Sequence, residues 1–69
     1  MKYLGREFKN YEEMHEWSKN NHIAEYRELA DMFSRNPSME LSILMGDRAK
    51  VLVESFDLTW TEIDELETA

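Results

Sequence analysis

The sequence predicts a mainly α-helical fold, a small bundle of four or five short helices preceded by an extended N-terminal segment. Large apolar residues recur at intervals of three and four along most of the chain, which is the spacing of one helix face. Residues that cap helices stand just before several of these stretches. Hydrophobic residues make up 42% of the 69 positions, enough for one core, so we expect residues 1–69 to form a single small domain.

Residues 2–8 are predicted to form an extended arm or an edge strand, because the segment is short and Gly5 interrupts it. Asn10 is a good N-cap, so a first helix is expected to begin after it. The apolar residues of this helix recur at every third position, at Tyr11, Met14 and Trp17. The helix is expected to end at about Lys19, because Asn20 and Asn21 together favour a turn.

The clearest amphipathic pattern follows and predicts a second helix that ends near Ser34. Its acidic residues lie on the side opposite the apolar stripe, which consists of Ile23, Tyr26, Leu29, Ala30 and Phe33. Asn36 is then expected to cap the next helix, with Pro37 at its first position, where the N–H that proline lacks is not needed.

Residues 38–56 fit two secondary structures. As helices, they place an apolar stripe on one face, with Gly46 as a C-terminal cap and Asp47 as a new N-cap. As a hairpin over residues 39–56, they alternate apolar and polar positions on either side of a Gly-Asp turn, which would give an α+β fold. A two-residue loop there puts the two apolar sets on opposite faces of the hairpin, so we favour helices.

The last helix is predicted from about Trp60 to about Glu67. Thr59, followed three residues later by Glu62, forms the capping-box pattern that marks a helix start. Trp60, Ile63 and Leu66 then recur at every third position, which gives this helix one apolar face.

Charge is distributed unevenly along the chain, whose net charge is −7. Residues 1–10 carry three basic residues and one acidic residue, whereas residues 36–69 carry eight acidic residues and two basic ones. The last sixteen residues have six acidic side chains and no basic one. Because phosphate backbones bind cationic surfaces, this distribution disfavours a nucleic-acid partner. The acidic face is either a solvated surface that keeps the protein in solution or a surface that meets a basic partner, as a docking patch or as a mimic of nucleic acid.

The residues that carry catalytic or metal chemistry are sparse. The chain has no cysteine, and His15 and His22 have no further ligand pattern around them, so we expect no metal site. Gly5 and Gly46 are isolated, unlike the clustered glycines of phosphate-binding loops. We therefore expect no enzyme activity and no cofactor. No apolar run exceeds three residues, so we expect a cytoplasmic protein with no membrane segment.

Residues 49–67 carry a leucine, a small residue, a tight turn, a capping hydroxyl and an isoleucine at set intervals, in the run Leu52-Val53-Glu54-Ser55-Phe56-Asp57-Leu58-Thr59 and then Ile63. This segment resembles the helix-turn-helix pattern of bacterial and phage regulators. The resemblance implies a helix pair joined by a tight turn and, as an alternative function, a DNA-binding transcriptional regulator. The sequence departs from the pattern at Val53, where alanine or glycine is usual, and at Asp57, where glycine is usual.

We therefore predict a small acidic protein-interaction module that acts as an inhibitor or adaptor of a basic-surfaced partner. Aromatic residues and methionines are numerous for so small a core, and both are enriched where proteins meet. A second copy of the chain is the alternative partner. The predicted contact residues are Trp60, Glu62, Asp64 and Glu65, with Trp17 and Tyr11 as secondary candidates.

Overall fold

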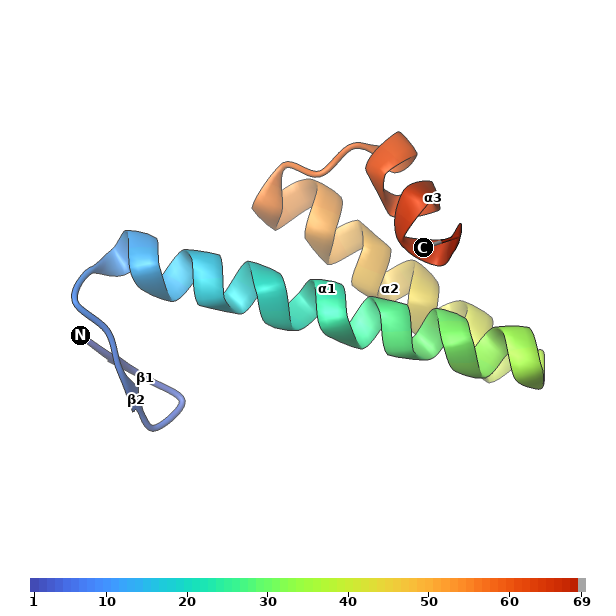
Figure 1. Ribbon diagram of the computed structural model, residues 1–69, viewed down its shortest axis with the longest axis horizontal. Helices are drawn as coiled ribbons and strands as arrows, with labels where there is room; N and C mark the ends of the chain where they lie inside the picture. Colours follow the sequence, from blue (N-terminus) through green and yellow to red (C-terminus); the bar gives the residue numbers. More distant parts are fainter. Residues whose placement is uncertain (69) are drawn as a thin grey trace.

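The computed structural model describes residues 1–68, which form three helices and one two-stranded sheet. In chain order the elements are β1 (Lys2–Tyr3), β2 (Arg6–Glu7), α1 (Tyr11–Arg35), α2 (Met39–Phe56) and α3 (Trp60–Thr68). The two long helices lie side by side and run in opposite directions, with α3 on one side of the pair and the hairpin on the other (Figure 1). The prediction of a mainly helical fold is confirmed, but the predicted number of four or five helices is wrong, because the described residues form three.

The N-terminal segment is a short antiparallel hairpin, in which Lys2 pairs with Glu7 and Tyr3 with Arg6. Leu4 and Gly5 form the turn at φ values of 51° and 80°, as a two-residue hairpin turn with two left-handed positions requires. The Met1 ammonium donates to the Phe8 carbonyl at 2.8 Å, and the Phe8 N–H donates to the Met1 carbonyl at 2.6 Å. The expected extended segment is therefore present, and the turn at Leu4 and Gly5 lets its two halves pair with each other.

Helix α1 begins where the sequence predicts, because the Glu13 N–H donates to the Asn10 side chain at 2.9 Å. The predicted break at Asn20 and Asn21 is wrong, since α1 continues through both. Asparagine inside a helix costs less than about 1 kcal/mol relative to alanine. His15 and His22, on either side of the pair, both contact the Phe56 ring of α2, at 4.8 and 5.2 Å between ring centroids. The free energy of these contacts with α2 on both sides of the asparagine pair exceeds the local preference of the pair for a turn.

Helix α2 is also continuous, so both the predicted helix boundary at Gly46–Asp47 and the alternative hairpin over residues 39–56 are wrong. The N-cap of α2 is Ser38, whose hydroxyl accepts from the Leu41 N–H at 3.1 Å, and not Asn36 as predicted. Asn36 instead closes α1, donating its N–H to the Met32 carbonyl at 3.0 Å. A helical glycine costs about 1 kcal/mol relative to alanine, which is less than burial of the apolar face of α2 provides.

The turn between α2 and α3 consists of residues 57–59. Asp57 adopts a left-handed conformation with φ of 58° and ends α2, and the Leu58 N–H donates to the Leu52 carbonyl at 3.2 Å. The predicted capping box then starts α3: the Glu62 N–H donates to Thr59 Oγ1 at 3.1 Å, and the Thr59 N–H donates to the Glu62 carboxylate at 3.0 Å. The capping predictions at Asn10 and Thr59 are confirmed, whereas those at Asn36, Gly46 and Asp47 are wrong.

The core lies where the three helices meet. Its buried residues come from all three helices and the turn before α3, and they are Tyr26, Ala49, Leu52, Leu58 and Ile63. Leu52 is fully buried. Phe8 is buried outside this cluster, against Trp17 of α1. Contacts in the core therefore hold α3 against the α1–α2 pair, and a separate aromatic contact holds the hairpin.

Candidate interaction surfaces

Helix α3 turns an acidic face outward. Ile63 is buried and Leu66 half-buried, so one side of the helix faces the core. Trp60 keeps 59% of its surface exposed, and Asp64 and Glu65 are exposed beside it. The four predicted contact residues of α3 are all accessible, but they do not share one face: Trp60 and Asp64 lie one turn apart, whereas Glu62, two positions from each of them, lies on another side of the helix.

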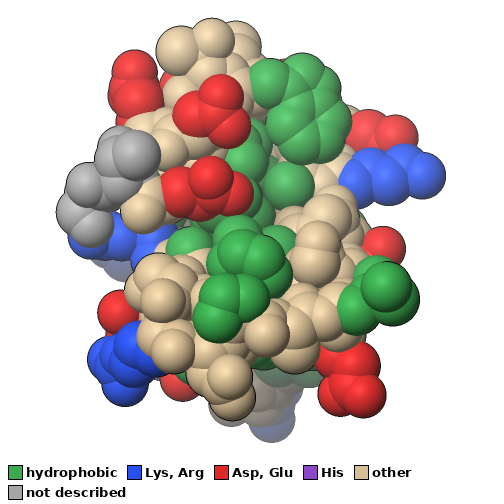
Figure 2. All heavy atoms as spheres, turned by 90° about the vertical axis from the view of Figure 1, so that its right-hand side faces the viewer, with side chains coloured by type: hydrophobic (Ala, Val, Ile, Leu, Met, Phe, Trp, Pro, Cys, Tyr) green, Lys and Arg blue, Asp and Glu red, His purple; other side chains and the backbone are tan. Residues whose placement is uncertain are grey.

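A pocket of about 280 Å³ opens beside Trp60, where α3 meets α1 and α2. We call it the three-helix pocket; its apolar walls include Tyr26, Phe33, Met45, Ala49, Trp60 and Ile63. Asp64 and Glu67 contribute carboxylates to the lining. Figure 2 shows this end of the molecule, with hydrophobic side chains gathered in a hollow and acidic side chains along one edge. The pocket therefore combines an apolar interior with negative charge.

Glu67 is held in position by Tyr26, whose hydroxyl donates to the Glu67 carboxylate. Burial raises the pKa of Tyr26 well above its usual value, and the hydrogen bond to Glu67 and the negative charges of Glu67 and Asp64 act in the same direction. Tyr26 thus stays neutral and remains a donor. One Glu67 oxygen is engaged by this bond, which fixes the carboxylate at the pocket.

Glu62, predicted as a contact residue, also has a structural role, which the prediction did not include. Its carboxylate accepts from the Thr59 N–H and, at 3.1 Å, from the Thr59 hydroxyl. These hydrogen bonds, the backbone one first, lower the pKa of Glu62. Because the carboxylate caps α3, a charge reversal at Glu62 would disturb the helix as well as any partner contact.

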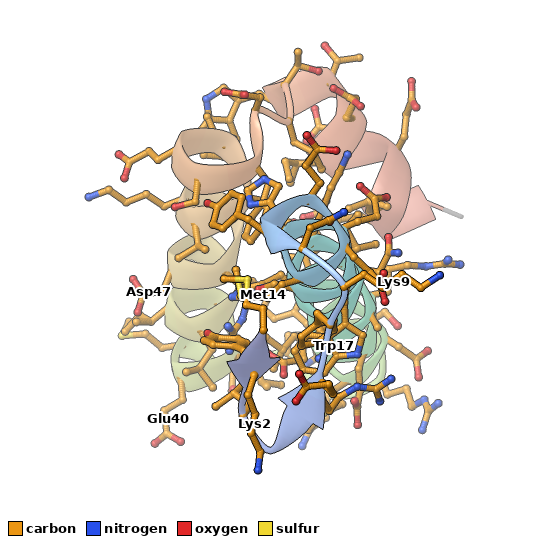
Figure 3. All side chains as sticks on the ribbon, turned by 90° about the vertical axis from the view of Figure 1, so that its left-hand side faces the viewer. Lys2, Lys9, Met14, Trp17, Glu40 and Asp47 are labelled. Atoms are coloured by element: carbon orange, nitrogen blue, oxygen red, sulfur yellow. The ribbon has the colours of Figure 1, made fainter. Side chains whose placement is uncertain are left out.

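The structure does not bring the two secondary candidates together with α3. Trp17 lies on the hairpin side of α1, whereas α3 covers the other side of the helix pair (Figure 3). The Trp17 ring is half-buried against Phe8, with ring centroids 5.4 Å apart, and the Arg6 guanidinium lies 5.2 Å from its centroid. Tyr11 is exposed and stacks on His15. We therefore assign Trp17 to docking of the hairpin.

A second hollow, of about 620 Å³, lies between α1 and α2. We call it the α1–α2 groove; Leu29 and Met32 of α1 and Leu44 and Val51 of α2 form its apolar lining. Arg48, also in the lining, forms an ion pair with Glu25 at 2.8 Å between Nη2 and Oε2. The sequence did not indicate this groove or the Phe33 and Met45 walls of the three-helix pocket, because both hollows combine side chains from more than one helix.

Neither a metal-binding group nor a membrane-spanning helix is found among the described residues. Among residues 1–68, acidic and histidine side chains form no group of three or more that could hold a metal ion. His22 Nδ1 lies 2.8 Å from the Ser18 carbonyl, so this ring is tied to its own helix. No helix in the described part of the chain combines the length and apolar character needed to cross a bilayer.

Comparisons with protein-family models, with curated proteins and with solved structures found no match for this chain.

Proposed function

We propose that this protein is a small acidic protein-interaction module, which binds a basic-surfaced partner through α3 and the three-helix pocket and thereby inhibits or links that partner. One observation carries the proposal: Trp60 is 59% exposed and lines a pocket that is apolar inside and bears two carboxylates. Exposed tryptophans beside pockets are frequent anchors of protein interfaces.

The lining favours a lysine or arginine side chain as the group that enters. The aliphatic stem of such a residue would pack on Phe33 and Met45, and its cationic end would meet the Asp64 carboxylate. The Trp60 ring adds a cation–π contact. Glu65, exposed on α3, extends the negative surface that would orient a basic partner on approach.

The DNA-binding alternative is supported by the short turn at residues 57–59 between α2 and α3, since the helix-turn-helix resemblance implies two helices joined by a tight turn. The charge of α3 opposes it. Residues 60–68 contain four acidic residues and no basic one, so the helix that would enter the major groove would be repelled by the phosphates. Titration of mixed-sequence duplex DNA at about 50 mM salt separates the two functions, because non-specific DNA binding is strongest at low salt.

The test of the proposal is affinity capture from the host with the tagged chain and matched variants. Trp60→Ala removes the exposed ring, and its control is Met39→Ala, since Met39 is 79% exposed and lies outside the pocket. Asp64→Lys with Glu65→Lys reverses two charges on α3, and Glu16→Lys with Glu54→Lys makes the same charge change on the exposed surfaces of α1 and α2. Glu62 is left unchanged because it caps α3.

We expect one set of basic proteins to be captured by the wild-type chain and both controls, and to be lost with Trp60→Ala and with the α3 charge reversal. Circular dichroism establishes that each variant is folded. Capture that is equally strong with all four variants would refute the assignment to α3. Tight binding of the wild-type chain to mixed-sequence DNA at low salt would favour the alternative function.

A further inference from the structure

The α1–α2 groove lies on the side of the helix pair that α3 leaves uncovered. On α1, Glu28, Leu29 and Met32 line the groove, whereas Tyr26 and Phe33 line the three-helix pocket, so the two hollows share no residue. The hairpin lies on the same side as the groove but near the N-terminal part of α1, where it contacts Trp17 (Figure 3). Residues 25–32 of α1 and 44–51 of α2 therefore border a groove that no described segment fills.

The apolar lining of this groove has the dimensions of a helix-binding surface. Leu44 and Val51 are seven positions apart on α2, which is about 10 Å, or two helical turns. Met32 and Leu44 are each about half exposed, at 45% and 50%, so they contribute apolar surface that the fold leaves in contact with water. A docked helix with apolar residues at positions i, i+3 or i+4, and i+7 would cover this surface.

On the opposite side of the α1–α2 pair, α3 already packs in the way that we expect of a docked helix. There α3, only nine residues long, lies against α1 and α2 and inserts Ile63 and Leu66. Two antiparallel helices present a furrow on each side of their contact, and a third helix can pack into either one. In this molecule one furrow is filled by α3 and the other is the α1–α2 groove.

The charges that border the groove identify the chemistry of its occupant. Glu25, Glu28 and Asp47 are acidic, and the basic Arg48 is already paired with Glu25. A second copy of this chain would bring the same acidic residues against each other, on top of a net charge of −7 for each chain. A cationic helix would instead meet complementary charge at Glu28 and Asp47.

We infer that the α1–α2 groove is a docking site for a cationic amphipathic helix of a partner protein. Its apolar residues would lie on Leu29, Met32, Leu44 and Val51, and its lysines or arginines would lie beside Glu28 and Asp47. The inference does not depend on the proposed role of α3, because the two surfaces share no lining residue. Together they would let one small chain join two partners.

The test uses a synthetic helical peptide of about 15 residues, with leucine at every third or fourth position and lysine flanking the leucine stripe. One control peptide carries glutamate in place of lysine, and another has the same composition with the leucines scattered around the helix. Binding is followed by ¹H–¹⁵N NMR of the labelled protein and by isothermal titration calorimetry. Sedimentation of the protein alone reports on self-association.

Two neighbouring variants isolate the groove. Leu44→Lys places a cation in the groove, and Ile43→Lys makes the same change at a residue that is similarly exposed, 57% against 50%, but lies outside the lining. We expect the cationic peptide to shift the resonances of the groove residues. Leu44→Lys should weaken the affinity for this peptide at least about tenfold, and Ile43→Lys should leave the affinity nearly unchanged. Trp60 and Asp64 are intact in both variants, so failure here is distinct from failure of the α3 proposal.

Three outcomes would overturn the inference. Equal binding of the cationic, acidic and scattered peptides would show that the groove selects neither charge nor pattern. Resonance shifts confined to the three-helix pocket would assign the peptide to the other surface. A concentration-dependent dimer of the protein alone, abolished by Leu44→Lys and kept by Ile43→Lys, would make a second copy the occupant.

Discussion

The replacement Gly46→Ala tests the continuity of helix α2 and is expected to stabilise the protein. Gly46 lies in the middle of an 18-residue helix, and a Cβ added there would meet no atom within 4 Å. With no steric penalty, the expected gain is the helix-propensity difference, about 0.5–1 kcal/mol. For a domain of this size, such a gain raises the melting temperature by roughly 2–8 °C.

The chain offers a matched control in its other glycine. Gly5 sits in the hairpin turn at φ of 80°, and a Cβ added there also meets no atom within 4 Å. Space is therefore equal at the two positions, and the backbone conformation alone differs. Because a left-handed conformation costs an L-residue roughly 1–2 kcal/mol, Gly5→Ala is expected to destabilise the hairpin.

Thermal and urea unfolding, followed by circular dichroism, measure both variants. A lower melting temperature for Gly46→Ala would refute the reasoning, because it would mean that residue 46 ends a helix in a left-handed conformation, as the sequence alone suggested. The same variant also probes the three-helix pocket. Gly46 is part of the pocket lining, so the new methyl group should weaken partner binding there while it strengthens the fold.

Three further predictions follow from single contacts. Because the folded-state pKa of Tyr26 is raised, the contribution of this hydroxyl to the free energy of unfolding is complete below about pH 10 and is lost as pH rises above that. Urea unfolding from about pH 8 to 11 should show this loss in the wild type and less of it in Tyr26→Phe. Since the pKa of Glu62 is lowered, its contribution is present above about pH 4.3 and is lost as pH falls through the folded-state pKa. Urea unfolding from pH 7 to about pH 3 should show this loss in the wild type and less of it in Glu62→Gln, which has no charge to lose. Thr59→Ala removes the capping hydroxyl of α3 and should cost about 1 kcal/mol in urea unfolding at pH 7. Leu4→Asn should stabilise the hairpin by up to about 1 kcal/mol, because asparagine tolerates the φ of 51°; NMR of the Trp17 indole reports the docked fraction, and an unchanged fraction would contradict this account of the turn.

Features decided by neighbouring residues could be predicted from the sequence. The caps at Asn10 and Thr59 depend on hydrogen bonds across three residues, and both form as predicted. The same local reasoning failed at the asparagine pair and at Gly46, where it predicted helix ends. Those preferences are worth at most about 1 kcal/mol each, and packing of α1 along α2 exceeds them.

The candidate site was only partly predictable for the same reason. The acidic character of α3 follows from its own sequence, but periodicity placed Trp60 on one face with Ile63, which is buried, whereas Trp60 is exposed. The three-helix pocket needs side chains from three helices, including Phe33 and Met45, which lie far from Trp60 in sequence. Trp17, which the sequence offered as a contact residue, is instead covered by the hairpin through the Phe8 ring.

The sequence by itself determined the helical character, the capped starts of α1 and α3, and the concentration of negative charge toward the C-terminus. These properties depend on hydrogen bonds and spacings within a few residues, or simply on composition. Only the tertiary structure decided that there are three helices in the described residues, that α3 fills one furrow of the α1–α2 pair, and that an acidic groove stays open on the other. Burial between distant segments sets these features, because packing of whole helix faces involves more free energy than the local preference of any one residue.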